Sequence, residues 1–267
     1  MALMFLVFAT CGCIESVCSG LIIDDATEQK TFRTITAAAY SLLHGDIAGF
    51  NQLASYDQRY YGIGFYLIAY PLQAAIRPVL AGHFQIDNET ALLLARRPVC
   101  FLLFAIATVI FYRCLRFQIR DKLVCAVFTA AFAMYPYVFG HAMINIKDSP
   151  FMSVYLICTY LSLRLVKTQL KGVSLLGGQI AGLGIATAAL ASIRIPGVMI
   201  ILQYGFTFFL TDLGKGRTTP RIVRPSNVLL FCVLMFPLVV LAYPALWRNP
   251  VQELFNAMKF MVSRLLL

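Results

Sequence analysis

Charged residues are scarce in this chain. Asp, Glu, Lys and Arg make up 13% of its 267 residues, about half their usual share in soluble domains, whereas 60% of the residues are hydrophobic. This scarcity excludes an ordinary soluble globular domain. The formal net charge of +10 does not indicate nucleic-acid binding, because the basic residues lie in short connections between apolar segments. In such connections they orient a membrane protein and contact anionic lipid.

The chain also lacks the cysteine patterns of metal sites and disulfide frameworks. Nearly all of its eight cysteines fall inside apolar segments, and Cys11-Gly12-Cys13 has no second pair at metal-ligand spacing. The first 20 residues contain no Lys or Arg, unlike the start of a signal peptide, and their apolar run is long. We therefore expect them to remain as a first membrane span.

Apolar segments of about 20 residues, the length that crosses a hydrocarbon core, are abundant. They predict an all-α polytopic transmembrane helix bundle of about seven spans, in a single domain covering residues 1–267. The expected spans are residues 2–23, 97–116, 121–140, 150–167, 175–193, 195–211 and 226–246.

One further segment, Tyr60–Leu80, is long enough to cross but contains two prolines and an arginine. If it does not cross, three short connections on one side (113–122, 164–171 and 212–224) hold half of the 22 Lys and Arg residues. The positive-inside rule favours this arrangement, which leaves residues 24–96 wholly on the outer side and residues 60–80 at the interface. If the segment crosses, every later connection changes sides.

On this topology nine of the 12 acidic residues share the outer side. Asp24, Asp25 and Glu28 directly follow the first span, and Asp148 lies in a second polar loop. A carboxylate at this surface can act as a general base. The simpler alternative is that the first cluster stabilises the positive end of a helix dipole and that Asp148 caps the next helix.

Basic residues on the predicted outer segments are candidates for binding phosphate. Arg194 lies in a tight turn between two apolar helices, and Lys147 precedes Asp148. A guanidinium beside a lipid-linked phosphate can donate two hydrogen bonds to it. Alternatively, these long side chains only anchor the helices by extending to the interface.

The order of these motifs resembles a known family. A first span ends in Asp24-Asp25, an amphipathic helix follows, and Arg59-Tyr60-Tyr61-Gly62 leads into the interfacial segment. Ala95-Arg96-Arg97-Pro98 then opens a span, and Lys147-Asp148-Ser149-Pro150 ends the second outer loop. This series resembles the C-type membrane glycosyltransferases of the protein-mannosyltransferase and aminoarabinose-transferase superfamily. The resemblance covers most of the chain, through order and spacing more than through any one string.

The resemblance implies transfer of a sugar from a polyprenyl-phosphate donor to an acceptor hydroxyl, with inversion. The protein would lie in a bacterial cytoplasmic membrane with its site facing the periplasm. The expected catalytic residues are Asp24, Asp25 and Asp148, and the expected donor-binding residues are Arg59, Arg96, Arg97, Lys147 and Arg194. The family usually has Asp-Glu where this chain has Asp24-Asp25. Its members generally continue with further spans and an outer C-terminal domain, a part of the pattern that is expected to be absent here.

No cofactor is expected, because basic residues can supply positive charge at the phosphate, although paired acids on two loops could also hold a divalent cation. The expected partners are the lipid-linked donor, the bilayer, and an acceptor glycan, lipid or protein, but not nucleic acid. Two other classes stay open. One is a non-catalytic protein that binds or transports lipid phosphates, and the other is an inactive fragment that serves as a partner helix bundle.

Overall fold

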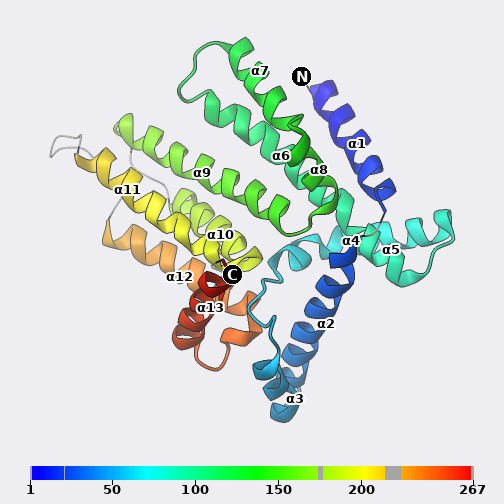
Figure 1. The fold of residues 1–267 in the computed structure, drawn as a ribbon. Helices are drawn as coiled ribbons and strands as arrows, with labels where there is room; N and C mark the ends of the chain where they lie inside the picture. Colours follow the sequence, from blue (N-terminus) through cyan, green and yellow to red (C-terminus); the bar gives the residue numbers. More distant parts are fainter. Residues whose placement is uncertain (1, 21, 174–176, 214–223, 266–267) are drawn as a thin grey trace.

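Every regular element in the described part of the chain is a helix (Figure 1). The computed structural model describes residues 2–20, 22–173, 177–213 and 224–265. Most of the predicted connection 212–224 lies outside these residues. The α-helices are α1 (Ala2–Cys18), α2 (Ile23–Leu43), α3 (Ile47–Asn51), α4 (Gly64–Phe84), α5 (Asn88–Leu94), α6 (Arg96–Leu115), α7 (Lys122–Ala133), α8 (Pro136–Ile144), α9 (Asp148–Leu170), α10 (Gly177–Ile193), α11 (Ile200–Leu213), α12 (Pro225–Ala242) and α13 (Pro250–Leu265). Short 3-10 helices are η1 (Gln52–Ser55), η2 (Ile195–Met199) and η3 (Pro244–Leu246).

Four helical segments among the described residues are long and apolar enough to cross a membrane, which is the pattern of an integral membrane protein. They are Asn88–Leu115, Asp148–Leu170, Ile195–Leu213 and Pro225–Ala242. The bent pair α7 and α8 makes a fifth if it counts as one span. The prediction of about seven spans is not confirmed, because α1 and α10 have only 17 residues each. A helix of that length is about 26 Å long, short of a hydrocarbon core of roughly 30 Å.

The predicted span 121–140 is broken in the middle. α7 ends at Ala133, and α8 starts at Pro136 with its axis bent by 57° from that of α7. Proline has no backbone N–H and disfavours a helical conformation in the residue before it. Tyr135 accordingly has an extended backbone, with ψ of 117°. The break lets α8 continue to Ile144, beyond the predicted end of the span.

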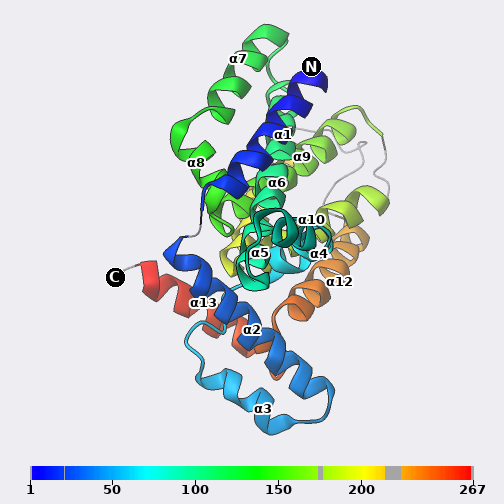
Figure 2. The same ribbon diagram turned by 90° about the vertical axis from the view of Figure 1, so that its right-hand side faces the viewer.

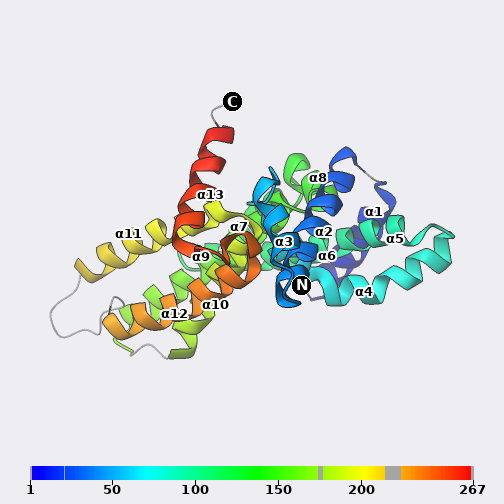
Figure 3. The ribbon, with the colours of Figure 1, turned by 90° about the horizontal axis from the view of Figure 1, so that it is seen from below.

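Helices α2 to α5 lie at the end of the bundle where α1 ends and α6 begins (Figures 1 and 2). α4 runs across the direction of α1 and α6 rather than along it, and α5 packs against α4. Seen from below, they pack side by side on one flank, with α11 and α12 on the other (Figure 3). α4 contains most of the segment predicted to lie at the interface, and it is not one of the four segments named above. That this segment does not cross stays a prediction.

Close backbone packing joins the start of α4 to the end of α10. A Cβ added to Gly62 or Gly64 would lie less than 3.0 Å from backbone atoms of Ser192, so only glycine lets the chain approach there. α10 itself is rich in Gly and Ala and packs against α9 and α12. The loop before α4 is thereby held against the turn that carries Arg194.

Candidate functional site

The acidic cluster lies in the first turns of α2, so the helix expected after Asp24-Asp25 already includes these two residues. Residues four apart in a helix share a face. Asp24 and Glu28 therefore form one stripe, and Asp25 and Gln29 form another, rotated by about 100°. Asp24 is exposed, whereas Asp25, Glu28 and Gln29 are buried. The two stripes contact different parts of the protein.

The stripe of Asp25 and Gln29 faces the start of α6. Arg97 Nη2 lies 2.6 Å from Asp25 Oδ2, and their side chains are only 0% and 4% exposed. Asp25 also accepts the backbone N–H of Ile22 at 2.9 Å, and Arg97 donates to Ser19 Oγ at 2.7 Å. Removing one partner of a buried ion pair typically costs about 3–5 kcal/mol. This pair therefore fixes the junction of α1, α2 and α6.

Arg96 is also enclosed beside α2. It donates to Gln29 Oε1, and its guanidinium lies 4.5 Å from the ring centroid of Tyr66 and 5.7 Å from that of Phe32. Its Nε and Nη1 have no acceptor among the described residues, and the aromatic faces partly compensate for this. Sequence reasoning placed Asp25, Arg96 and Arg97 in the catalytic and donor sites. The structure gives all three buried partners that join helices, and their predicted roles at the site stay predictions.

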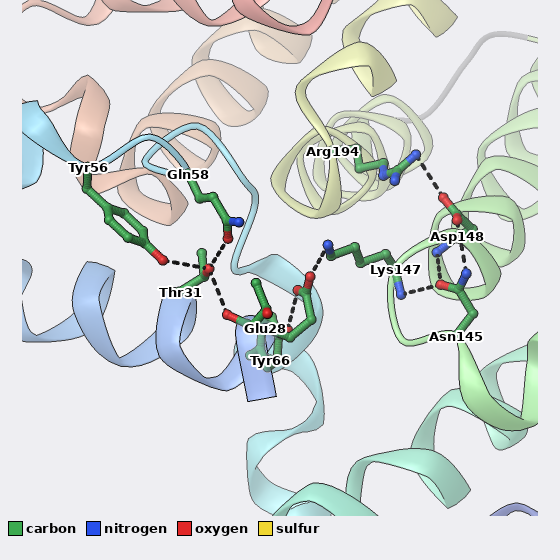
Figure 4. Close-up of polar contacts among 10 residues, drawn as sticks. Glu28, Thr31, Tyr56, Gln58, Tyr66, Asn145, Lys147, Asp148 and Arg194 are labelled. Carbon is green, nitrogen blue, oxygen red and sulfur yellow. Dashed lines mark hydrogen bonds and ion pairs between the residues drawn. The ribbon is translucent and has the colours of Figure 1, made fainter. Parts of the chain in front are cut away.

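On the other stripe, Glu28 faces the loop between α8 and α9 (Figure 4). Lys147 Nζ forms an ion pair with Glu28, which also accepts a 2.8 Å hydrogen bond from the hydroxyl of Tyr66. The Lys147 ammonium lies 4.7 Å from the ring centroid of Tyr61. An ammonium held by a carboxylate and an aromatic face is oriented before any ligand arrives.

Asn145 organises the loop that carries Lys147 and Asp148. Its Oδ1 accepts the backbone N–H groups of Lys147 at 3.0 Å and Asp148 at 2.8 Å. Its Nδ2 lies 3.0 Å from both Asp148 Oδ2 and His141 Nδ1. The alternative that Asp148 caps α9 is therefore wrong, because Lys147 occupies the N-cap position and Asp148 is the first helical residue. The carboxylate of Asp148 is left free to contact another segment.

That segment is the turn between α10 and η2. Arg194 Nη1 lies 2.8 Å from Asp148 Oδ1, and their side chains are 38% and 49% exposed. The backbone of Arg194 is extended, which matches the predicted tight turn between two helices. Among the described residues Arg194 makes a single ion pair, through one nitrogen, so its other N–H groups remain able to donate.

Charges within this cluster act on one another. Burial lowers the pKa of Lys147 below its usual 10.5, and Arg194 lowers it further. The carboxylates of Asp24 and Asp148 act in the opposite direction. Asp24 shares its stripe of α2 with Glu28, the ion-pair partner of Lys147. We call Asp24, Glu28, Lys147, Asp148 and Arg194 the outer-loop cluster.

Arg59 makes its contacts elsewhere. It donates to Tyr60 Oη at 3.3 Å, and that hydroxyl donates to Glu253 on α13 at 2.5 Å. Arg59, Arg248 and Glu253 are among the residues that line a cavity of about 80 Å³. Within the described residues, no group of three His, Cys, Asp or Glu side chains is arranged to hold a metal ion.

Sequence reasoning missed three residues that shape the outer-loop cluster, namely Glu28 as the partner of Lys147, Tyr66 and Asn145. The four-residue spacing of Asp24 and Glu28 was a usable signal, because it puts both carboxylates on one face of a helix. Nothing in the local sequence pointed to Tyr66, which reaches Glu28 from α4.

No protein-family model, no curated protein and no solved structure matches this chain.

Proposed function

We propose that this chain is a membrane glycosyltransferase that moves a sugar from a polyprenyl-phosphate donor to an acceptor hydroxyl at the predicted outer face. The observation that carries the proposal is the outer-loop cluster. It brings three separate segments together, and the exposed carboxylate of Asp24 lies on the same stripe of α2 as Glu28, the ion-pair partner of Lys147. Of the residues that the resemblance and their chemistry assigned to the site, Lys147, Asp148 and Arg194 are neighbours there, and Asp24 lies on the stripe of α2 that carries Glu28.

The proposed reaction uses the two charge types for different steps. Asp24 takes the proton of the acceptor hydroxyl while that oxygen attacks the anomeric carbon of the sugar. The bond from this carbon to the phosphate oxygen breaks on the opposite side, so the configuration inverts and the lipid phosphate leaves with the bonding electrons. Negative charge grows on the phosphate in this step, and cations placed beforehand lower its energy.

Lys147 and Arg194 would supply that charge. Both already have a carboxylate partner, Glu28 and Asp148 respectively, and the cluster carries one more acid than base. The partners do not consume all donors, because an ammonium has three N–H bonds and a guanidinium five. We assign to Glu28 and Asp148 the task of holding the two cations in place, and to Asp24 alone the task of base.

Replacing Asp24 by Asn tests the assignment. The full chain in detergent would be given polyprenyl-phosphate sugars and a membrane extract as the source of acceptor, and loss of labelled sugar from the lipid would be followed. We expect Asp24→Asn to retain donor binding and to lower transfer by about 10²–10⁴-fold, the usual contribution of a general base. Transfer at the wild-type rate would refute the role of Asp24.

Asp25→Asn is the matched control, because it removes the neighbouring carboxylate. Because Asp25 forms a buried ion pair with Arg97, the main effect of Asp25→Asn should be a loss of thermal stability. Asp24→Asn should leave thermal stability nearly unchanged. A non-catalytic protein that binds or transports lipid phosphates would use the same cations. In that case the wild type, Asp24→Asn and Asp25→Asn would all bind donor and none would transfer sugar. This outcome would refute the enzyme proposal in favour of a binding or transport protein.

A further inference from the structure

A second charged site lies at the opposite end of α9 from the outer-loop cluster. A cavity of about 250 Å³ opens there, lined by Phe117, Tyr160, Arg164, Lys167, Thr168 and Lys171. α9 has 23 residues and is therefore about 34 Å long, close to the thickness of a hydrocarbon core. The cavity thus lies where this helix leaves the other face of the membrane.

Its cations follow one face of α9. Arg164, Lys167 and Lys171 are separated by three and then four residues, and the hydroxyl-bearing Thr168 lies between them on the same face. Like charges at these spacings destabilise an isolated helix. The carbonyl end of the helix dipole offsets part of this repulsion, because the cations lie in the last turns. An anion bound among the three cations would offset the remaining repulsion between them.

Aromatic rings hold two of these cations over the cavity. Lys167 Nζ lies 4.9 Å from the ring centroid of Phe117, and the Arg164 guanidinium lies 5.9 Å from that of Tyr160. The two rings contact each other, with centroids 5.8 Å apart. Phe117 comes from the connection after α6, which adjoins the end of α9 at the same end of the bundle (Figure 1). The site is therefore built from two segments and is more than the end of one helix.

No acidic side chain lines this cavity in the part of the chain that the structure describes. Arg164, Lys167 and Lys171 form none of the ion pairs found among the described residues. Asp212 contacts this end of α9, but its carboxylate accepts a hydrogen bond from the side chain of Gln169. Gln169 lies on the buried face of the helix. Acidic side chains among the described residues therefore do not neutralise the positive charge at the cavity.

We propose that this cavity binds the phosphate of an anionic lipid headgroup. A lipid headgroup and a free phosphate would both present a phosphate oxyanion to the cavity. Three cations and one hydroxyl donor in the lining suit such an anion. The position at the end of a membrane-spanning helix favours a lipid over a soluble phosphate. Basic pockets between helices at the inner face are suited to such headgroups. The inference stands apart from the glycosyltransferase proposal, because it involves none of the same residues.

Thermal unfolding of the full chain in uncharged detergent tests the inference. Added phosphatidylglycerol should raise the unfolding temperature in a saturable way, and phosphatidylcholine should not. Lys167→Gln should weaken the apparent affinity for phosphatidylglycerol by about tenfold or more, the loss expected for one charge-assisted contact to phosphate. Lys167→Arg retains the charge and should restore most of the affinity.

Lys122→Gln is the matched control, because Lys122 is an exposed cation at the start of α7 that does not line the cavity. It should leave the response to phosphatidylglycerol unchanged. Equal losses in Lys122→Gln and Lys167→Gln would overturn the proposal in favour of general surface charge. Inorganic phosphate that stabilises the protein as strongly as the lipid would overturn the lipid source and identify a soluble phosphate as the ligand.

Discussion

At the scale of single residues, the surroundings of Lys147 have a direct consequence for pH dependence. Its pKa is lowered from 10.5 chiefly by burial, with Arg194 acting in the same direction and Asp24 and Asp148 opposing it. Glu28 and the ring of Tyr61 complete its surroundings. Lysine binds phosphate in its protonated form. We therefore expect donor affinity to fall with rising pH, and to begin falling below the range of an ordinary lysine.

Donor binding to the wild type and to Lys147→Arg, measured between about pH 7 and pH 11, checks this expectation. The phosphodiester of the donor keeps its charge over that range, and arginine remains protonated, so binding to Lys147→Arg should stay level. An identical decline in both proteins would assign the pH dependence to another group.

The contribution of Lys147 to folding stability should change with pH in the opposite direction to donor affinity. The unfolded chain binds more protons between the lowered pKa and 10.5, so the contribution of Lys147 to stability rises with pH in that window.

The residues of the site could be predicted only in part. Residue type and position in the outer segments identified Asp24, Lys147, Asp148 and Arg194, which the structure brings together, and their chemical roles stay predictions. The same reasoning could not separate Asp24 from Asp25. Which of two adjacent carboxylates faces Arg97 depends on how α2 packs on α6, and this is a tertiary contact without a local signal.

At the scale of elements, the contact between the start of α4 and the end of α10 predicts a strong effect from a small substitution. A Cβ at Gly62 would meet the carbonyl oxygens of Ser192 and Ile193, which are backbone atoms and cannot turn aside. We expect Gly62→Ala to lower the free energy of unfolding by about 1–3 kcal/mol, the usual effect of overpacking. It should also weaken donor binding by displacing Tyr61 and Arg194.

Gly82→Ala provides the comparison. Gly82 lies inside α4 with no atom within 4 Å of an added Cβ, so alanine should stabilise the helix by about 0.5–1 kcal/mol. Thermal unfolding in detergent would measure both variants. If Gly62→Ala were as stable as the wild type or more stable, close packing would not require a glycine at position 62.

Apolar length predicted where the helices lie more reliably than it predicted which of them are long enough to cross a membrane. A helix occupies each of the seven predicted spans, but length and composition qualify only four helical segments, or five with the bent pair, as able to cross a membrane. The bend in the predicted span 121–140 follows from Pro136, a local cause that the sequence contains. α1 and α10 are different, because no proline breaks them and they fall short by length alone, with 17 residues each.

At the scale of the whole molecule, the proposals depend on which side of the membrane each connection lies. α2 to α5 gather at the end of the bundle that carries the outer-loop cluster, and the basic cavity lies at the other end of α9 (Figure 1). If α4 does not cross, as the positive-inside rule predicts, residues on both sides of α4 share one face of the membrane. If α4 crossed instead, residues before and after it would face opposite sides.

Single cysteines at Asn51 and Asn88 decide between the two arrangements, because both residues are exposed and they flank α4. Each would be introduced into a chain whose eight native cysteines are replaced and treated with a membrane-impermeant thiol reagent in sealed vesicles of known orientation. The positive-inside rule predicts that both are labelled from the outside. A cysteine at Lys122, in a basic connection, should be labelled only after the membrane is permeabilised. Labelling of Asn51 and Asn88 from opposite sides would show that α4 crosses, and it would separate Asp24 from Asp148 by the thickness of the bilayer. The ion pair of Glu28 with Lys147 joins the same two segments and is incompatible with that separation, so it favours labelling of both cysteines from the outside.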